Sequence, residues 1–352
     1  MKKKIICFYP SNQKRTNHFL YNLSRLVESS GFFECVGYKE VKKKSPGKIF
    51  FADIYHLNWF DQSRDLASFF KRMFFLFALR LKKKKIVWTI HNIESHIATP
   101  SYNKLLFYFL ARFSTIIHTM NLETVKIANL ERFRNKIRMI PHGDYYDSYP
   151  DSDFDVRGHY GIEKSRRIFL FLGAIQPYKN VDVLIDAFGK TFEAESSPVL
   201  LVCGRVEPDY YLESIRRKLE GISSIVLDSR FIADGEMSAY VRSADILVAP
   251  YGFRSSLNSG TIPLAFSYGK TLICSDIPCV KDIQSEMDCL YHYHYSSRAE
   301  HVQVLSEKLS KAYFDILDGS IREKEKNAVL YMKKNSWKAH QREWIQLYGA
   351  SV

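Results

Sequence analysis

The sequence predicts an α/β protein of two domains, each a parallel sheet with helices on both faces. Short apolar runs of strand length alternate with amphipathic runs of helical length. The alternation breaks in a stretch rich in Asp, Tyr, Gly and Pro at 141–164, and it restarts afterwards. We therefore expect domains at 1–150 and 165–335, a helix at about 336–352 that packs back on the first domain, and an interdomain cleft.

The first domain is predicted to alternate strands and helices of ordinary length. Strands are expected at 5–9, 49–57, 85–90, 115–118 and 137–140. Helices are expected at 17–29, 64–81, 102–113 and 122–131.

The second domain repeats the pattern after the linker. Strands are expected at 168–172, 198–203, 223–227, 246–249 and 271–274. Helices are expected at 181–192, 209–219, 234–243, 259–268, about 299–317 and about 336–348. In the last of these, Trp337, Trp344, Ile345 and Tyr348 fall at helical spacing and are suited to docking on a neighbouring domain.

Composition indicates a folded chain with full cores. The 352 residues are 46% hydrophobic and 14% aromatic, which excludes intrinsic disorder. Six cysteines form no CxxC pair, as expected of reduced thiols in a cytoplasmic protein. No signal peptide is visible, and the best apolar run, Met73–Leu79, is far shorter than the roughly 20 residues that cross a bilayer.

The formal charge of +13 belongs entirely to the first half. Residues 1–150 hold 26 Lys and Arg against 11 Asp and Glu, whereas the remainder holds 25 against 27. The segment 64–85 sets five phenylalanines among cations, and 103–113 repeats the theme. These features predict attachment to an anionic membrane surface. The alternative is a pair of core helices with charged outer faces.

Two strand-to-helix turns of the second domain predict a diphosphate site. Gly173 ends the first strand there, and Lys179 precedes the following helix. The turn after 246–249 carries Arg254 and the small polar run Asn258, Ser259, Gly260 and Thr261. A cation beside exposed amides at a helix start suits phosphate. Further donor-site candidates that follow strands at the same edge are Arg205, Arg230 and Phe231.

Histidines of the first domain are candidates for the acceptor side. His91, Glu94 and His96 follow a strand end, where a general base must stand to take a hydroxyl proton. His18 follows the first strand loop, and His56 and His142 lie at the ends of other predicted strands, where we expect them to bind sugars or cap loops. The HNIESH spacing does not match the HEXXH zinc motif, so we expect no metal site.

Five stretches in a fixed order carry a resemblance to a known family. They are FLGAIQPYKNVDVLIDAF, RFIADGEMSAYVRSADILVAPY, DIYHLNWF, WTIHNIESH and IPHGDY. The chain resembles a GT-B glycosyltransferase of the family-4-like group, which builds bacterial surface polysaccharides and lipid-linked oligosaccharides. The resemblance implies that Lys179 binds the donor diphosphate. It also implies a UDP- or GDP-sugar donor, no other cofactor or essential metal, and a polyprenyl-diphosphate-linked or oligosaccharide acceptor at the inner face of the cell membrane.

The chain departs from that family at three positions. Aligned on Pro263, Asn258 and Phe266 stand where the family has two glutamates, and Ala174 stands where an arginine is usual. The missing carboxylates favour an inverting reaction with a base from the loop at 91–96. Two alternatives stay open at this point: a nucleotide-sugar epimerase of GT-B fold, and a basic nucleic-acid-binding protein. No nucleic-acid-binding motif is legible, so we expect no nucleic-acid partner.

Overall fold

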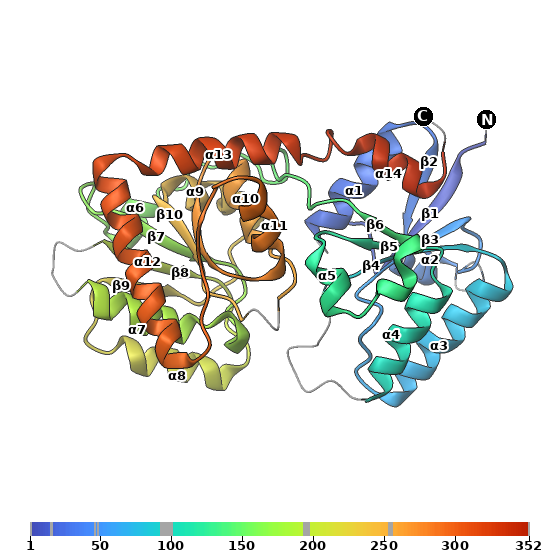
Figure 1. Ribbon diagram of the computed structural model, residues 1–352, viewed down its shortest axis with the longest axis horizontal. Helices are drawn as coiled ribbons and strands as arrows, with labels where there is room; N and C mark the ends of the chain where they lie inside the picture. The colour runs from blue at the N-terminus through green and yellow to red at the C-terminus, as the bar shows by residue number, and fades with distance from the viewer. Residues whose placement is uncertain are drawn as a thin grey trace. The chain divides into compact units, whose positions relative to one another are not determined.

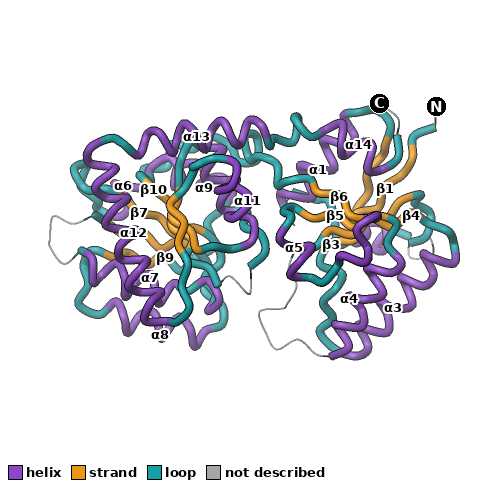
Figure 2. Tube along the Cα trace, in the orientation of Figure 1, coloured by secondary structure: helices purple, strands orange, loops and turns teal. Residues whose placement is uncertain are grey.

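The computed structural model describes residues 2–14, 17–45, 47, 49–91, 101–192, 198–252 and 256–350. The chain divides into two compact units: unit 1 is Met1–Gly143 with Asn335–Val352, and unit 2 is Asp144–Lys334. In each unit the strands form a central parallel sheet with helices on both faces (Figure 2). No helix within those ranges has the length and apolar character needed to cross a bilayer.

Unit 1 begins with a strand and ends with a helix from the far end of the chain (Figure 1). Its strands are β1 (Lys4–Tyr9), β2 (Phe33–Gly37), β3 (Ile54–Asn58), β4 (Lys85–Thr89), β5 (Ile116–Thr119) and β6 (Ile137–Met139). Its helices are α1 (His18–Ser29), α2 (Tyr38–Lys44), α3 (Leu66–Leu81), α4 (Ser101–Phe113), α5 (Glu123–Ile127) and α14 (Gln341–Tyr348).

Unit 2 is continuous in the chain. Its strands are β7 (Ile168–Leu172), β8 (Val199–Cys203), β9 (Ile225–Asp228), β10 (Ile246–Ala249), β11 (Leu272–Ser275) and β12 (Tyr291–Tyr293). Its helices are α6 (Val156–Tyr160), α7 (Val181–Thr191), α8 (Asp209–Leu219), α9 (Asp234–Ser243), α10 (Thr261–Ser267), α11 (Pro278–Glu286), α12 (Arg298–Asp318) and α13 (Ile321–Lys334).

The two sheets have different strand orders. Unit 2 runs β12-β11-β10-β7-β8-β9, which is the Rossmann order with its switch point between β7 and β10. Unit 1 runs β2-β1-β3-β4-β5-β6, which is a flavodoxin-like order with its switch point between β1 and β3. Both are doubly wound α/β sheets, and in such sheets ligands bind beyond the carboxyl ends of the strands at the switch point.

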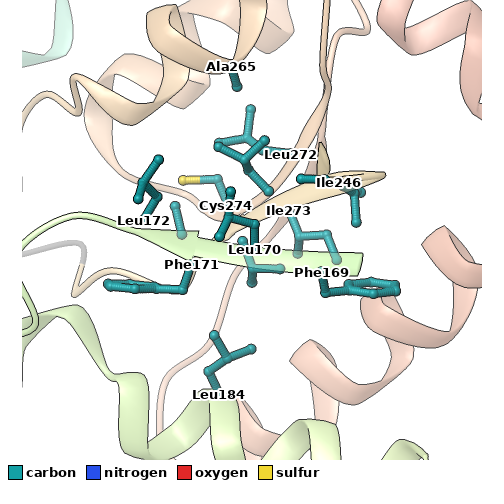
Figure 3. Packing of buried hydrophobic residues seen from close by; sticks show 14 of the residues in the cluster. Phe169, Leu170, Phe171, Leu172, Leu184, Ile246, Ala265, Leu272, Ile273 and Cys274 are labelled. Carbon is teal, nitrogen blue, oxygen red and sulfur yellow. The ribbon is translucent and has the colours of Figure 1, made fainter. Parts of the chain in front are cut away.

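The core of unit 2 is built on β7, whose five residues are all buried. Phe169 and Phe171 point to the side of the sheet where Leu184 of α7 lies, while Ala265 of α10 lies on the opposite side (Figure 3). Successive side chains of a strand point to opposite faces of the sheet. Because both faces are buried here, every residue of β7 is apolar, which gives the continuous apolar run in the sequence. This run therefore anchors the loop that follows Leu172.

Several elements were not predicted. Edge strands β2 and β12 are short and interrupted by polar residues such as Glu34 and His292, so their apolar signal is weak. Helices α13, α2 and α11 were also missed because their apolar signal is weak. Helix α13 is highly charged, and α2 and α11 are short. The predicted linker contains α6, whose Asp155 caps the helix by accepting from the Gly158 amide.

Candidate active site

Unit 2 brings two loops together at the switch point between β7 and β10. The first loop follows β7 and passes through a short 3₁₀ helix, Pro177–Lys179, before α7 begins. The Gly252 amide of the second loop donates to the Tyr178 carbonyl oxygen at 2.9 Å. The Asn180 side-chain amide donates to the Pro250 carbonyl oxygen, also at 2.9 Å. These hydrogen bonds hold the two loops against each other. Both loops carry residues of the predicted diphosphate site.

The half-buried side chain of Lys179 lies where these loops meet. Its Nζ atom is 5.5 Å from the ring centroid of Tyr251 and 6.0 Å from that of Tyr178. Within the described part of the chain, no carboxylate forms an ion pair with it. Loss of hydration lowers the pKa of Lys179 to about 8. At pH 7 this ammonium group is mostly charged and poorly hydrated, so an anionic ligand would stabilise it strongly.

Two glycines let the backbone pack closely beside Lys179. Gly173 has φ +126°, and a Cβ atom there would lie 3.7 Å from Lys179 Nζ. Gly204, which follows β8, has φ +147°, and a Cβ atom there would lie 2.0 Å from the Gly173 carbonyl oxygen. A side chain at 204 would therefore push the two strand ends apart, and both positions favour glycine for conformation as well.

The second loop presents small polar groups at the start of α10. The Tyr251 hydroxyl lies 2.9 Å from Thr261 Oγ1, and Ser259 Oγ accepts from the Thr261 amide at 3.2 Å. Gly260 forms the N-cap of the helix. Because Tyr251 also lies beside Lys179, the predicted residues of both loops are close to one another. Arg254, the second predicted cation, lies outside the described residues and stays a prediction.

The other two predicted arginines are already paired with carboxylates. Exposed Arg205 forms an ion pair with Glu207 at 3.0 Å. Arg230 donates to Asp228 at 2.9 Å and to Glu236 at 2.6 Å, and the hydrogen bond with Glu236 is the main cause that raises its pKa. A ligand phosphate would have to compete with these carboxylates, so both arginines are weaker candidates for phosphate contact than Lys179.

Phe231 is an exposed aromatic residue that follows the carboxyl end of β9, and hydrogen bonds hold the residues around that strand end. Behind it, the Tyr160 hydroxyl donates to Asp228 at 2.5 Å and lies 2.7 Å from the Tyr240 hydroxyl. Arg230 donates to the same Tyr240 hydroxyl at 2.8 Å. Sequence reasoning missed this network because its members come from three separate elements. It fixes the loop that presents Phe231.

The positions that depart from the family pattern have different surroundings. Phe266 is fully buried in α10, and its ring centroid lies 5.9 Å from that of Tyr331. Asn258 is half-buried, and Ala174 is exposed. At position 266 a buried aromatic core residue therefore replaces the expected carboxylate.

In unit 1, His91 follows β4 and is held by Asn58, the last residue of β3, and by Trp59, which follows it. Its Nε2 atom lies 2.9 Å from Asn58 Oδ1, and its ring stacks on Trp59 with centroids 4.0 Å apart. The Asn58 amide nitrogen donates to the carbonyl oxygens of Tyr9 and His56, so Oδ1 is the acceptor and His91 Nε2 carries the proton. Burial lowers the pKa of His91 well below 6.5, which leaves a neutral ring with its lone pair on Nδ1.

Further aromatic residues surround His91. The Phe19 ring lies 5.5 Å from His91 and 5.0 Å from His142, measured between centroids. His142 Nδ1 donates to the Gly143 carbonyl oxygen at 2.7 Å, and burial lowers the His142 pKa to about 4. His18, half-buried, is the first residue of α1. The predicted histidines at 18, 91 and 142 thus belong to one end of this sheet.

His56 differs from the acceptor-side prediction. It lies inside β3, fully buried, and its Nδ1 accepts from the Tyr348 hydroxyl at 2.7 Å. Its Nε2 donates to Thr89 Oγ1 at 2.6 Å, and Thr89 donates to His118 Nδ1 at 3.0 Å. His118 Nε2 then donates to the Ile140 carbonyl oxygen at 2.9 Å, which sets the direction of the whole chain. His56 therefore lies in the core, because both of its ring nitrogens are hydrogen-bonded to buried residues, Thr89 and Tyr348.

Some residues of the site were not singled out from the sequence. Asn58 and Trp59 belong to the stretch DIYHLNWF, but their contacts with His91 are tertiary. A polar residue at the carboxyl end of a buried strand is the one signal that points to Asn58. Asn180 and Tyr251 were missed in the same way in unit 2. The predicted residues Glu94 and His96 lie outside the described residues.

The two groups of residues suit different ligands. In unit 2, a poorly hydrated cation and a glycine-rich turn suit a diphosphate. In unit 1, a neutral histidine with a defined tautomer among aromatic rings suits a hydroxylated ligand that must lose a proton.

Comparison with known proteins finds similar sequences and similar folds. Residues 166–307 match the family described as glycosyl transferases group 1. The D-rhamnosyltransferase WbpZ of Pseudomonas aeruginosa is 25% identical over 226 residues, which cover 63% of this chain and 54% of that protein. The alignment thus spans about half the length of this relative.

Solved structures extend the likeness to the whole chain. HepE of Anabaena, in complex with UDP and glucose, has a TM-score of 0.70 at 11% identity, over 99% of each chain. Sucrose-phosphate synthase of Thermosynechococcus elongatus has a TM-score of 0.73 at 13% identity, over 99% of this chain and 98% of that one. The chain therefore has the GT-B fold of the glycosyltransferases.

Proposed function

We propose that this chain is a metal-independent glycosyltransferase. It moves a hexose-type sugar from a UDP- or GDP-sugar to a lipid-linked or oligosaccharide acceptor in bacterial surface polysaccharide synthesis. The group 1 match and the likeness to a D-rhamnosyltransferase support sugar transfer. The likeness to HepE, solved with UDP and glucose, supports a nucleotide-sugar donor. An acceptor on polyprenyl diphosphate would place the enzyme at the inner face of the cell membrane.

The single observation that carries the proposal is Lys179 at the switch point of unit 2. Its pKa of about 8 and its lack of a carboxylate partner among the described residues distinguish it from Arg205 and Arg230. A site that holds an unpaired, poorly hydrated cation is prepared for an anion. A nucleoside diphosphate is the anion that the fold and the relatives favour.

Lys179 would act on the leaving group. When the bond between the anomeric carbon and the diphosphate oxygen breaks, the electron pair stays on the diphosphate and its negative charge grows. A preorganised cation stabilises that charge more than it stabilises the ground state, which lowers the barrier. The loss of one such donor costs roughly 2.7–4 kcal/mol in comparable sites.

His91 would act on the acceptor. The acceptor hydroxyl oxygen forms the new bond to the anomeric carbon, and its proton moves to His91 Nδ1. Asn58 fixes the tautomer in which Nδ1 carries the lone pair. A single displacement of this kind inverts the anomeric centre, so we propose inversion.

Ligand-dependent thermal unfolding tests the proposal. UDP, GDP and their sugar conjugates should each be compared, since a ligand at 100 times its Kd adds about 2.7 kcal/mol of stability. We expect one nucleotide series to stabilise the wild type and to stabilise Lys179→Gln far less. Lys190→Gln, an exposed lysine of α7, is the matched control and should behave as wild type. Equal stabilisation of all three proteins, or of none, contradicts the proposal.

An assay without acceptor separates transfer from isomerisation. A transferase leaves the donor nearly unchanged until an acceptor is added. Conversion of the donor into another nucleotide sugar with no acceptor present would overturn transfer in favour of an epimerase.

A further inference from the structure

Helix α3 carries a stripe of large apolar side chains on its exposed face. Phe70, Phe74, Phe77 and Leu81 are exposed to 65%, 73%, 42% and 83%. At about 100° per residue these four positions, with exposed Leu66, fall within a sector about 80° wide. The sequence alternative of a charged outer face therefore does not describe this helix.

The core of unit 1 does not account for the stripe. A separate set of side chains, Phe69, Phe75, Leu76 and Leu79, is buried and packs inward. The helix is thus apolar on its buried side and again on its exposed side. A contiguous exposed apolar surface of this kind marks an interaction site.

Helix α4 extends the same surface. The two helices lie side by side in unit 1 (Figure 1). The Phe77 ring lies 5.7 Å from Phe109 and 5.0 Å from Phe113, measured between centroids. Leu105 and Tyr108 of α4 are also exposed. The α3–α4 surface, defined as the exposed side chains of these two helices, is therefore continuous.

Cations surround this surface. Between positions 64 and 85 the chain has eight Lys and Arg and a single acid, Asp65. That acid caps α3, where its side chain accepts from the Ser68 amide at 2.6 Å. Exposed cations that flank the stripe include Lys71, Arg80 and Lys83.

We propose that the α3–α4 surface inserts into the interface of an anionic lipid bilayer. An apolar stripe between cations matches a bilayer surface, where acyl chains lie beneath acidic headgroups. A second copy of the chain is a poorer partner, because a symmetric contact through this face would oppose two sets of like charges. The inference rests on the proposed function only in that a lipid-carried acceptor requires the enzyme at a membrane.

Co-sedimentation with vesicles tests the inference. Vesicles of phosphatidylcholine alone should be compared with vesicles that contain about 30 mol% phosphatidylglycerol. The second kind carries the negative surface charge of an acidic membrane. We expect the wild type to bind the anionic vesicles and to be released by salt. The variant Phe70→Ser/Phe74→Ser/Leu81→Ser should bind at least tenfold more weakly. The variant Lys71→Gln/Arg80→Gln/Lys83→Gln should bind roughly 100-fold more weakly and show a smaller salt dependence than the wild type.

A matched control lies in unit 2. Phe314→Ser/Leu317→Ser removes two exposed apolar residues of α12 and should bind vesicles as the wild type does. Unchanged binding in both α3 variants would overturn the inference. A wild-type dimer that the phenylalanine variant converts to a monomer would also overturn it, in favour of a second copy as the partner.

Nucleotide binding by the same variants separates this inference from the proposed function. If the α3 variants keep their nucleotide affinity and lose vesicle binding, both proposals stand. If no protein binds any nucleotide but the vesicle results hold, only the proposed function fails. If nucleotide binding is normal and no α3 variant changes vesicle binding, only the membrane surface fails.

Discussion

The two units place their charge in opposite ways. The first 150 residues carry the whole net positive charge of the chain, and many of these cations flank the exposed apolar stripe of α3. The residues found at the carboxyl end of its sheet are instead neutral histidines and aromatic rings. Unit 2 is slightly acidic, with 23 Lys and Arg against 28 Asp and Glu, but a poorly hydrated lysine lies at its switch point. The net charge of the first half therefore indicates a binding surface on the outside of unit 1. The poor hydration of single buried side chains instead indicates the candidate active-site residues.

The difference in strand order fits this contrast. The switch point of unit 2 lies between β7 and β10, the two strands whose loops surround Lys179. The switch point of unit 1 lies between β1 and β3, and His91 is held by Asn58 at the end of β3 and by Trp59 after it. Each order thus presents a different pair of loops, and each pair suits one half of a transfer reaction.

The largest effect on activity is expected when the lysine cation of unit 2 is removed. Lys179→Gln should lower kcat/KM by roughly 10²–10³-fold, because the departing diphosphate loses its nearest positive charge. Steady-state kinetics with the preferred donor would measure this, with Lys190→Gln as control. An effect below threefold would remove Lys179 from the mechanism.

The corresponding test in unit 1 replaces the neutral histidine. His91→Gln should lower kcat by about 100-fold, because general-base catalysis contributes at least that much. The Kd for the nucleotide should stay within about twofold of the wild type, since we propose that donor and acceptor bind to different units. Calorimetry of nucleotide binding beside the kinetics would check this. A matched loss of nucleotide affinity would break the division of roles.

The protonation of Lys179 gives a smaller effect. Because its pKa is lowered to about 8, the charged form dominates below that pH and is lost above it. A diphosphate prefers the charged form, so affinity should be full near pH 7 and fall as pH rises. We expect Kd for the nucleotide to be about tenfold weaker at pH 9 than at pH 7. In Lys179→Gln this pH dependence should disappear, and a wild-type slope in that variant would assign it to another group.

The smallest effect concerns the hydrogen-bonded chain in the core of unit 1. Tyr348→Phe leaves His56 Nδ1 buried without its donor, which costs about 1–2 kcal/mol of unfolding free energy. Urea unfolding would measure it, and Tyr210→Phe, an exposed tyrosine, should have no effect. The loss should be confined to unit 1. A loss in unit 2 alone would contradict the assignment.

Much of the fold was visible in the sequence because buried parallel strands are continuous apolar runs. β7, β8 and β10 were predicted within one residue, and α8 and α9 were predicted at both ends. Edge strands β2 and β12 were missed because they are only partly buried, so polar residues interrupt their runs.

The site was visible only in part. Cations and histidines after strands are legible, which is why Lys179 and His91 were found. Partners that come together through tertiary contacts are not legible, so Asn58 and Trp59 were missed. His56 was assigned to the acceptor side, but it lies inside β3, whose five residues are all buried. Its partner Tyr348 comes from the far end of the chain, so the local sequence does not show that this histidine belongs to the core.

The last helix has a consequence for how the protein is made. Unit 1 is incomplete until Asn335–Val352 is available, and that segment is synthesised roughly 190 residues after Gly143. Trp344 and Tyr348 of this segment are buried in the core of unit 1. At 5–20 residues per second the delay is about 10–40 s. On the ribosome, the later half should therefore reach its native state first, while the earlier half waits with part of its interior uncovered.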